Sequence, residues 1–141
     1  MLDPFCGVGG ILLEAGVLGI RATGIELDEK WAEGAEENAW FFRLEKKVSV
    51  INQDFLEWDG KKFECIVTDL PYGKSSGLFG KKLDELYLKA FDKFHKHTKK
   101  VVVMAQQDLR RQLKAKGWKV KYTTSFYVHK SMRRHIHVCE S

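Results

Sequence analysis

Apolar residues recur along the chain in two alternating patterns, compact runs and wider spacings of three or four positions. The compact runs predict strands at residues 21–26, 47–54, 63–69 and 100–105, after a first strand that ends near Leu2. The wider spacings predict helices that begin near Ile11 and then cover residues 30–44, 83–94 and 108–116. Strands that alternate with helices in this way predict an α/β fold with a mostly parallel sheet.

The helical segment at residues 30–44 also predicts how it packs. Trp31, Ala35, Ala39 and Phe42 recur at helical spacing, and glutamates occupy other positions. We expect the apolar side of this helix to pack on the sheet.

Two further strands, residues 118–129 and 134–139, close the chain. Too few residues join them for a crossover helix, so they are expected to be antiparallel. Gly117 is placed to end the helix before them. The predicted fold class is therefore α/β, a Rossmann-like, doubly wound, mostly parallel sheet with a C-terminal antiparallel hairpin.

Composition predicts one compact domain, because 141 residues with 44% hydrophobic content suffice for a single sizeable core. No apolar stretch approaches the ~20 residues of a membrane span, and no signal peptide opens the chain. We therefore expect a cytoplasmic protein without membrane contact. Cys6, Cys65 and Cys139 are widely spaced and odd in number, which predicts reduced thiols.

Charge is divided unevenly between the two halves of the chain. Residues 1–60 hold 5 Lys and Arg against 12 Asp and Glu, whereas residues 61–141 hold 19 against 7. An acidic first half suits a cationic cofactor, and a basic second half suits a polyanionic substrate such as RNA. Lysine-rich solubilisation is the alternative explanation of the basic half.

The densest motif is Leu2-Asp3-Pro4-Phe5-Cys6-Gly7-Val8-Gly9-Gly10, between the first strand and the first helix. Its glycines let the backbone approach a nucleotide-like ligand, and the helix N-terminus offers N–H groups. Glu26 follows Gly7 by 19 residues, close to the spacing at which an acid meets ribose hydroxyls. Asp3 would repel a pyrophosphate but attract a cation, which favours S-adenosylmethionine over NAD. A tight turn that binds nothing is the alternative.

Two more acids follow the third and fourth strands, at the side of an open α/β sheet where ligands bind. Asp54 is placed to accept a hydrogen bond from an adenine amino group, with Phe55 packed on the base. Asp69 begins the second motif, Asp69-Leu70-Pro71-Tyr72.

Together, D-P-F-C-G-x-G-G and D-x-P-Y-G resemble the motifs of class I S-adenosylmethionine-dependent methyltransferases, in the amino-methylating branch marked by Asp/Asn/Ser-Pro-Pro-aromatic. Within that branch the chain looks like the archaeal and eukaryotic tRNA guanosine N2-methyltransferases, over nearly all of its length. The resemblance implies a cofactor site of Asp3, Pro4, Phe5, Gly7, Gly9, Glu26, Leu27, Asp54 and Phe55. It implies a catalytic motif of Asp69, Leu70, Pro71 and Tyr72, with Leu70 where the family usually has a stiffening proline.

Members of that family also carry a cofactor-covering helix before the first motif and a separate N-terminal RNA-binding domain of the THUMP type. Only two residues precede Asp3 in this sequence. We therefore expect residues 1–141 to be a methyltransferase domain without this N-terminal segment and RNA-binding domain, either as a fragment of a larger enzyme, which we favour, or as a naturally shortened catalytic domain. A partner subunit is the other source of the missing part.

The chemistry explains why the second motif needs these residue types. An exocyclic amine on a base is a poor nucleophile because its lone pair is delocalised into the ring. Hydrogen bonds to the Asp69 carboxylate and the Leu70 carbonyl are expected to favour a pyramidal nitrogen, while Tyr72 stacks on the extruded base.

Basic residues near the two predicted loops of the second half suit RNA phosphates. Those assigned to the substrate are Lys74, Lys130, Arg133 and Arg134, with a solvated charge run as the alternative. The histidine pairs 95/97 and 135/137 lack a carboxylate or cysteine at the usual ligand spacing, so we expect no metal.

The leading prediction is methyl transfer to an exocyclic amine of RNA, most simply N2 of a tRNA guanosine. The same acid and aromatic residue would also serve adenine N6 in DNA or RNA. The alternative outside the enzymes is a catalytically silent module, which keeps the fold and binds RNA or a partner.

Overall fold

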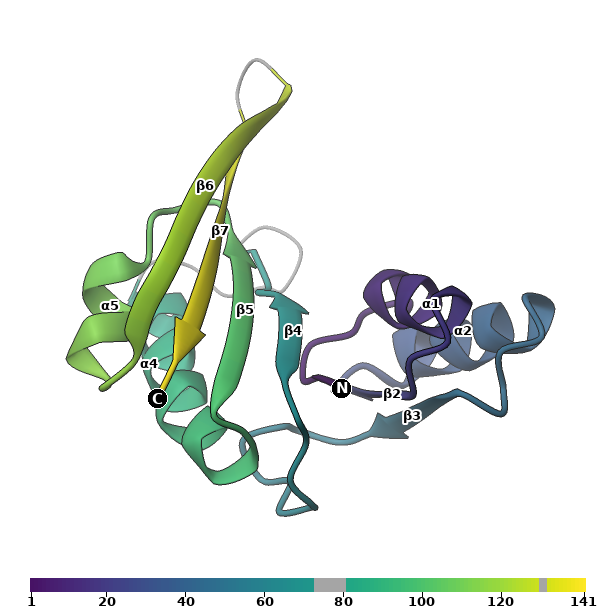
Figure 1. Cartoon of the computed structure of the whole chain (residues 1–141). Helices are drawn as coiled ribbons and strands as arrows, with labels where there is room; N and C mark the ends of the chain where they lie inside the picture. The colour runs from purple at the N-terminus through teal and green to yellow at the C-terminus, as the bar shows by residue number, and fades with distance from the viewer. Residues whose placement is uncertain (73–80, 130–131) are drawn as a thin grey trace.

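The computed structural model describes residues 1–72, 81–129 and 132–141, in which strands and helices alternate (Figure 1). The strands are β1 (Leu2–Asp3), β2 (Ala22–Glu26), β3 (Val48–Asn52), β4 (Ile66–Asp69), β5 (Lys100–Ala105), β6 (Lys119–His129) and β7 (Met132–Glu140). The helices are α1 (Gly10–Val17), α2 (Glu29–Phe41), α4 (Lys81–His97) and α5 (Arg110–Ala115).

Within the described residues the strands form a seven-stranded sheet in the order β3-β2-β1-β4-β5-β7-β6. The pairs among β1 to β5 are parallel, whereas β7 runs antiparallel to both of its neighbours. The long β6–β7 hairpin projects beyond the rest of the sheet (Figure 1). The predicted fold class, with its C-terminal antiparallel hairpin, is confirmed.

Helices cover both faces of the sheet, as expected of a doubly wound fold. Ala22 of β2 belongs to an apolar cluster with Leu12 of α1 and Ala39 of α2. Ile25, which points to the opposite face of the same strand, belongs to a second cluster that includes Phe91 of α4 and Leu113 of α5. Alternation along a single strand therefore separates the two halves of the core.

The packing of α2 corrects one prediction. Ala35 and Ala39 are buried as expected, but Trp31 is 44% exposed and Phe42 is 55% exposed and lies beyond the end of the helix. Small side chains let α2 come close to the first motif, since a Cβ atom added at Gly9 would lie 3.2 Å from the Ala35 Cβ atom. A large ring such as that of Trp31 would not fit between α2 and the Gly9 turn.

The end of α5 agrees with the sequence-based prediction. Gly117 has a φ of 82° and its N–H group donates to the Lys114 carbonyl, so it ends α5 as predicted. Cys6, Cys65 and Cys139 are free thiols. Among the described residues, none of the helices combines the length and apolar character needed to cross a membrane.

The register of the parallel strands brings their carboxyl ends to one edge of the sheet. Asp3 pairs with Gly24, Glu26 with Asn52, and Asp69 with Met104. β3 ends at Asn52 rather than at the predicted residue 54, so Asp54 lies in the loop that leaves this edge.

Gly24 provides a test of the close packing between β2 and the first motif. A Cβ atom there would lie 2.5 Å from Leu12 Cδ1 and 2.6 Å from Cys6 Sγ. We expect Gly24→Ala to lower the free energy of unfolding by about 2 kcal/mol, measured by urea denaturation, because overpacking displaces these side chains. Gly10→Ala is the matched control, since a Cβ atom there would meet no described atom within 4 Å. Equal stability of the two variants would contradict this account.

Candidate functional site

A cavity of about 640 Å³ opens at the carboxyl ends of the strands. Most of the predicted cofactor and catalytic residues line it, namely Pro4, Phe5, Gly7, Glu26, Leu27, Asp54, Phe55, Asp69, Leu70, Pro71 and Tyr72. Its size lies within the range of pockets that hold small molecules. The two motifs, far apart in sequence, therefore form one wall.

Glu26 joins the ends of β1 and β2 at this cavity. Its Oε2 atom accepts a hydrogen bond from the Gly7 N–H group at 2.8 Å, and its Oε1 atom accepts one from the Asp28 N–H group at 2.9 Å. Because a carboxylate oxygen has two lone pairs, both oxygens keep capacity to accept a ligand hydroxyl. The acid therefore fixes the first turn and still presents acceptors to the cavity.

Gly7 and Gly9 give the first turn its shape. Their φ angles are 52° and 87°, in the left-handed region that side chains disfavour. Gly7 lines the cavity beside Trp31, whose ring would lie 3.7 Å from a Cβ atom at that position. Gly9 caps α1 and touches α2, outside the cavity wall.

Asp3 lies behind the cavity wall, with 1% of its surface exposed. Its Oδ1 atom accepts hydrogen bonds from the Thr68 hydroxyl at 2.7 Å and the Phe5 N–H group at 3.2 Å. Burial raises the pKa of this carboxyl to about 7, although the two hydrogen bonds oppose the shift, and the charges of Asp69 and Glu26 add to it. Asp3 thus anchors the turn and changes charge near neutral pH.

Asp54 and Phe55 also line the cavity. The Asp54 carboxylate accepts a hydrogen bond from the Leu56 N–H group at 2.8 Å, which holds the loop after β3. Phe55 lines the cavity but is only 2% exposed, because its ring packs edge-on against Phe5, 5.8 Å between centroids, and at a tilt against Phe94, 5.6 Å between centroids. The ring is therefore held in a fixed orientation by the core.

The second motif is anchored on both sides. Leu70 is buried, and its N–H group donates to the Met104 carbonyl at 2.9 Å. The Tyr87 hydroxyl of α4 donates to the Pro71 carbonyl at 2.7 Å. These contacts hold the backbone at Pro71 and at Leu70, where the family usually has a proline.

Asp69 and Tyr72 face each other at the centre of the motif. The Tyr72 hydroxyl donates to Asp69 Oδ1, and Arg134 Nη1 lies 3.3 Å from Asp69 Oδ2. Burial raises the pKa of Asp69, while the Tyr72 hydrogen bond and the Arg134 charge oppose that shift. Burial and the neighbouring carboxylate also raise the pKa of Tyr72, so its hydroxyl stays a donor.

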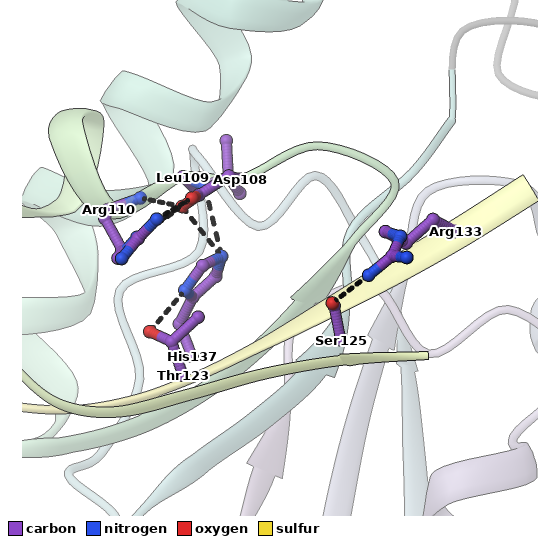
Figure 2. Close-up of polar contacts among 7 residues, drawn as sticks. All are labelled: Asp108, Leu109, Arg110, Thr123, Ser125, Arg133 and His137. Atoms are coloured by element: carbon purple, nitrogen blue, oxygen red, sulfur yellow. Dashed lines mark hydrogen bonds and ion pairs between the residues drawn. The ribbon is translucent and has the colours of Figure 1, made fainter. Parts of the chain in front are cut away.

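The predicted substrate residues separate in the structure. Arg134 reaches the second motif. Arg133 instead donates to the Ser125 hydroxyl at 2.6 Å (Figure 2). The Arg133 guanidinium also lies over the Tyr127 ring, 4.0 Å from its centroid. Lys74 and Lys130 fall outside the described residues.

Other residues of the cavity wall were not predicted from the sequence. They are Ile25, Asp28, Trp31, Gln53 and Leu86. Ile25, Asp28 and Gln53 adjoin residues that were predicted, so a wider window around each strand end would have included them. Trp31 and Leu86 reach the cavity from α2 and α4, and their helical spacing assigns them only to packing.

His137 and His95 make contacts within the fold rather than at the cavity. His137 is buried, where its Nε2 atom accepts a hydrogen bond from the Leu109 N–H group and its Nδ1 atom lies 3.2 Å from the Thr123 hydroxyl (Figure 2). His95 stacks on Trp118 at 4.0 Å between centroids. Across the described parts of the chain, no group of three or more His, Cys, Asp or Glu could hold a metal ion.

The strand order, the antiparallel β7 and an acidic cavity at the carboxyl edge define the class of Rossmann-like methyltransferase folds. Residues 1–136 match the family described as the RMKL-like methyltransferase domain, and the chain belongs to this family. The cofactor of that class of enzyme is S-adenosylmethionine, in agreement with the sequence-based prediction.

Similar proteins agree with this assignment. The chain is 35% identical to the tRNA (guanine(10)-N2)-dimethyltransferase of Methanothermobacter thermautotrophicus, a match that covers 99% of this chain and 43% of the relative. It is 33% identical to the Pyrococcus abyssi protein of the same name, over 100% of this chain and 44% of the relative. The crystal structure of TrmN from Thermus thermophilus shares the fold, with a TM-score of 0.81 and 21% identity over 99% of this chain and 43% of that one. The chain thus spans less than half the length of these proteins.

The buried carboxyl of Asp3 predicts an unusual pH dependence of stability. Its pKa is raised to about 7 in the folded state, against about 4 in an unfolded chain, so the folded state binds the proton more tightly. Between these values stability is expected to fall as pH rises, by at most about 4 kcal/mol. Denaturant titrations at several pH values should show this decline, and Asp3→Asn should reduce it.

Asp92→Asn, which removes an exposed carboxylate of α4, is the control and should retain the wild-type slope. An Asp3→Asn protein with the same decline as the wild type would show that Asp3 is ionised when buried.

Proposed function

We propose that this chain catalyses S-adenosylmethionine-dependent methylation of an exocyclic amine in RNA, and that the amine is N2 of a guanosine in tRNA. The observation that carries the proposal is a single cavity that joins Glu26 and Asp54 to the Asp69–Tyr72 motif. The names of the similar proteins, which act on guanine N2 of tRNA, support the choice of base.

The residues of the cavity fit the cofactor. Glu26 offers two carboxylate oxygens to ribose hydroxyls, and Asp54 offers an acceptor to an adenine amino group. Ile25 and Phe55 line the cavity from within the core, and we assign them to the apolar wall against which the base packs. The Asp3 carboxylate, in its ionised form, gives the remaining end a negative potential, which suits sulfonium and ammonium groups.

S-adenosylmethionine supplies a methyl group on a positively charged sulfur, and the protein then needs to direct an amine toward that carbon. We assign two acceptors to the amine, the Asp69 carboxylate and the Leu70 carbonyl. These acceptors draw the nitrogen away from the plane of the ring, so that its lone pair points at the methyl carbon. Tyr72 packs on the base, and catalysis rests on positioning and electrostatics.

The basic second half of the chain and the reach of the β6–β7 hairpin support RNA binding. Arg133, Arg134 and, outside the described residues, Lys74 and Lys130 are assigned to phosphates. Since the chain spans 43% of its first relative, an RNA-binding domain elsewhere in a larger enzyme stays part of the proposal.

Binding of S-adenosylmethionine, measured by titration calorimetry, separates an enzyme from a silent module. Glu26→Gln is expected to weaken binding by about tenfold or more, because it loses charged hydrogen bonds to the ribose and loosens the Gly7 turn. Glu29→Gln, an exposed change in the first turn of α2, is the control and should bind like the wild type. A wild-type protein that binds no cofactor would favour the silent module.

The target base is tested by nucleoside mass spectrometry after incubation with tRNA or DNA. N2-methylguanosine is the expected product, and Asp69→Asn should slow its formation by about a hundredfold or more while cofactor binding is retained. Asp108→Asn, outside the cavity, is the matched control. Formation of N6-methyladenosine would instead assign the chain to adenine.

A further inference from the structure

Arg134 already holds the contacts that the target base is expected to make. Its Nη1 atom lies 3.3 Å from Asp69 Oδ2, and its guanidinium carbon lies 5.4 Å from the centroid of the Tyr72 ring. The other carboxylate oxygen accepts the Tyr72 hydroxyl. A planar group with N–H donors therefore contacts both the carboxylate and the aromatic ring.

The sheet register explains how Arg134 reaches the site. Asp69 pairs with Met104 across β4 and β5, and Met104 pairs with Ile136 across β5 and β7. Because β7 is antiparallel, Arg134 lies two residues farther toward the carboxyl edge than Ile136, on the same face of the sheet. Arg133 points to the other face and contacts Ser125 (Figure 2).

The Arg134 side chain is incompletely satisfied in this position. Its Nε atom is buried and has no hydrogen-bond partner within the part of the chain that the structure describes. A buried donor without an acceptor raises the free energy of a conformation. The ion pair with Asp69 offsets that cost, so this arrangement is one that a competing ligand can displace.

We propose that Arg134 is a stand-in for the target base, a positioning residue that occupies the Asp69–Tyr72 site until the base enters and then transfers to a phosphate of the RNA. The inference rests on the proposed function, because it takes an aminopurine nucleotide as the ligand. A guanidinium group and the N–C–N edge of guanine share a planar shape with adjacent N–H donors, so one site accommodates either.

The exchange couples binding of the base to binding of the RNA backbone. A free nucleoside must displace Arg134 and gives its charge no new partner. A nucleotide within RNA offers a phosphate to the released guanidinium. The site therefore discriminates against isolated nucleosides.

The first experiment compares guanosine and a tRNA transcript as ligands of the full chain carrying Arg134→Gln. Guanosine is expected to bind about fivefold more tightly than to the wild type, because the competing ion pair is gone. The transcript is expected to bind several-fold more weakly, with a salt dependence reduced by about one ion. Arg110→Gln, which removes an exposed arginine paired with Asp108, is the charge-matched control for guanosine and should leave its affinity unchanged.

In Arg134→Gln the affinity for guanosine should rise while the affinity for the transcript falls. A merely structural role for Arg134 would not produce these opposite changes. Guanosine affinity that is unchanged or lower in Arg134→Gln would overturn the inference. Arg134→Lys keeps the charge but not the planar group. It should therefore bind tRNA almost as tightly as the wild type, while its affinity for guanosine stays above the wild-type value.

The second experiment needs no nucleic acid and follows the Asp69 carboxyl carbon by NMR, with Asp69→Asn for assignment. The charged and titratable groups near this carboxyl are Arg134 of β7, Tyr72, Tyr87 of α4 and Asp3 of β1. Loss of the arginine charge should raise the pKa of Asp69 in Arg134→Gln, whereas Arg134→Lys and Arg110→Gln should titrate like the wild type. An Asp69 titration that is the same in all four proteins would also overturn the inference.

Failure of the proposed function has a different signature. It would appear as a wild-type protein that forms no methylated nucleoside, whereas the stand-in role is judged from the variants of Arg134 alone.

Discussion

Carboxylates that converge on one rim of a sheet repel each other, and this structure depends on how that repulsion is offset. Each acid accepts hydrogen bonds from neighbouring groups: Asp3 from Thr68 and Phe5, Glu26 from Gly7 and Asp28, Asp54 from Leu56, and Asp69 from Tyr72. Most of these donors are backbone N–H groups in the turns that follow the strands. The acids therefore hold the turns in place, and the turns stabilise the acids, at an edge whose negative potential suits a cationic ligand.

The fold was largely predictable because its central strands are buried on both faces and appear in the sequence as compact apolar runs. The order of elements, the antiparallel hairpin and the end of α5 at Gly117 all follow from that pattern and from loop length. The orientation of α2 could not be predicted from the hydrophobic pattern. Periodicity marks one side of a helix, but the contact of Ala35 with the Gly9 turn decides which part of that side is buried, and Trp31 is left outside.

The candidate site was predictable where its residues directly follow strand ends, since topology alone brings Glu26, Asp54 and Asp69 to one edge. Residues that reach the cavity from helices, such as Leu86, depend on tertiary packing that a motif does not record. The separation of Arg133 from Arg134 depends on which face of β7 each occupies. Charge alone assigned both to phosphates, and only the register of β5 and β7 reveals that one of them reaches Asp69.

Trp31 is partly open to solvent and also lines the cavity beside Gly7. Trp58 and Trp118 are enclosed by the core, and Trp40 lies at the exposed end of α2. An indole whose surroundings change from water to a bound ring alters its emission spectrum. The protein therefore carries a built-in optical reporter of cavity occupancy, which needs no attached dye.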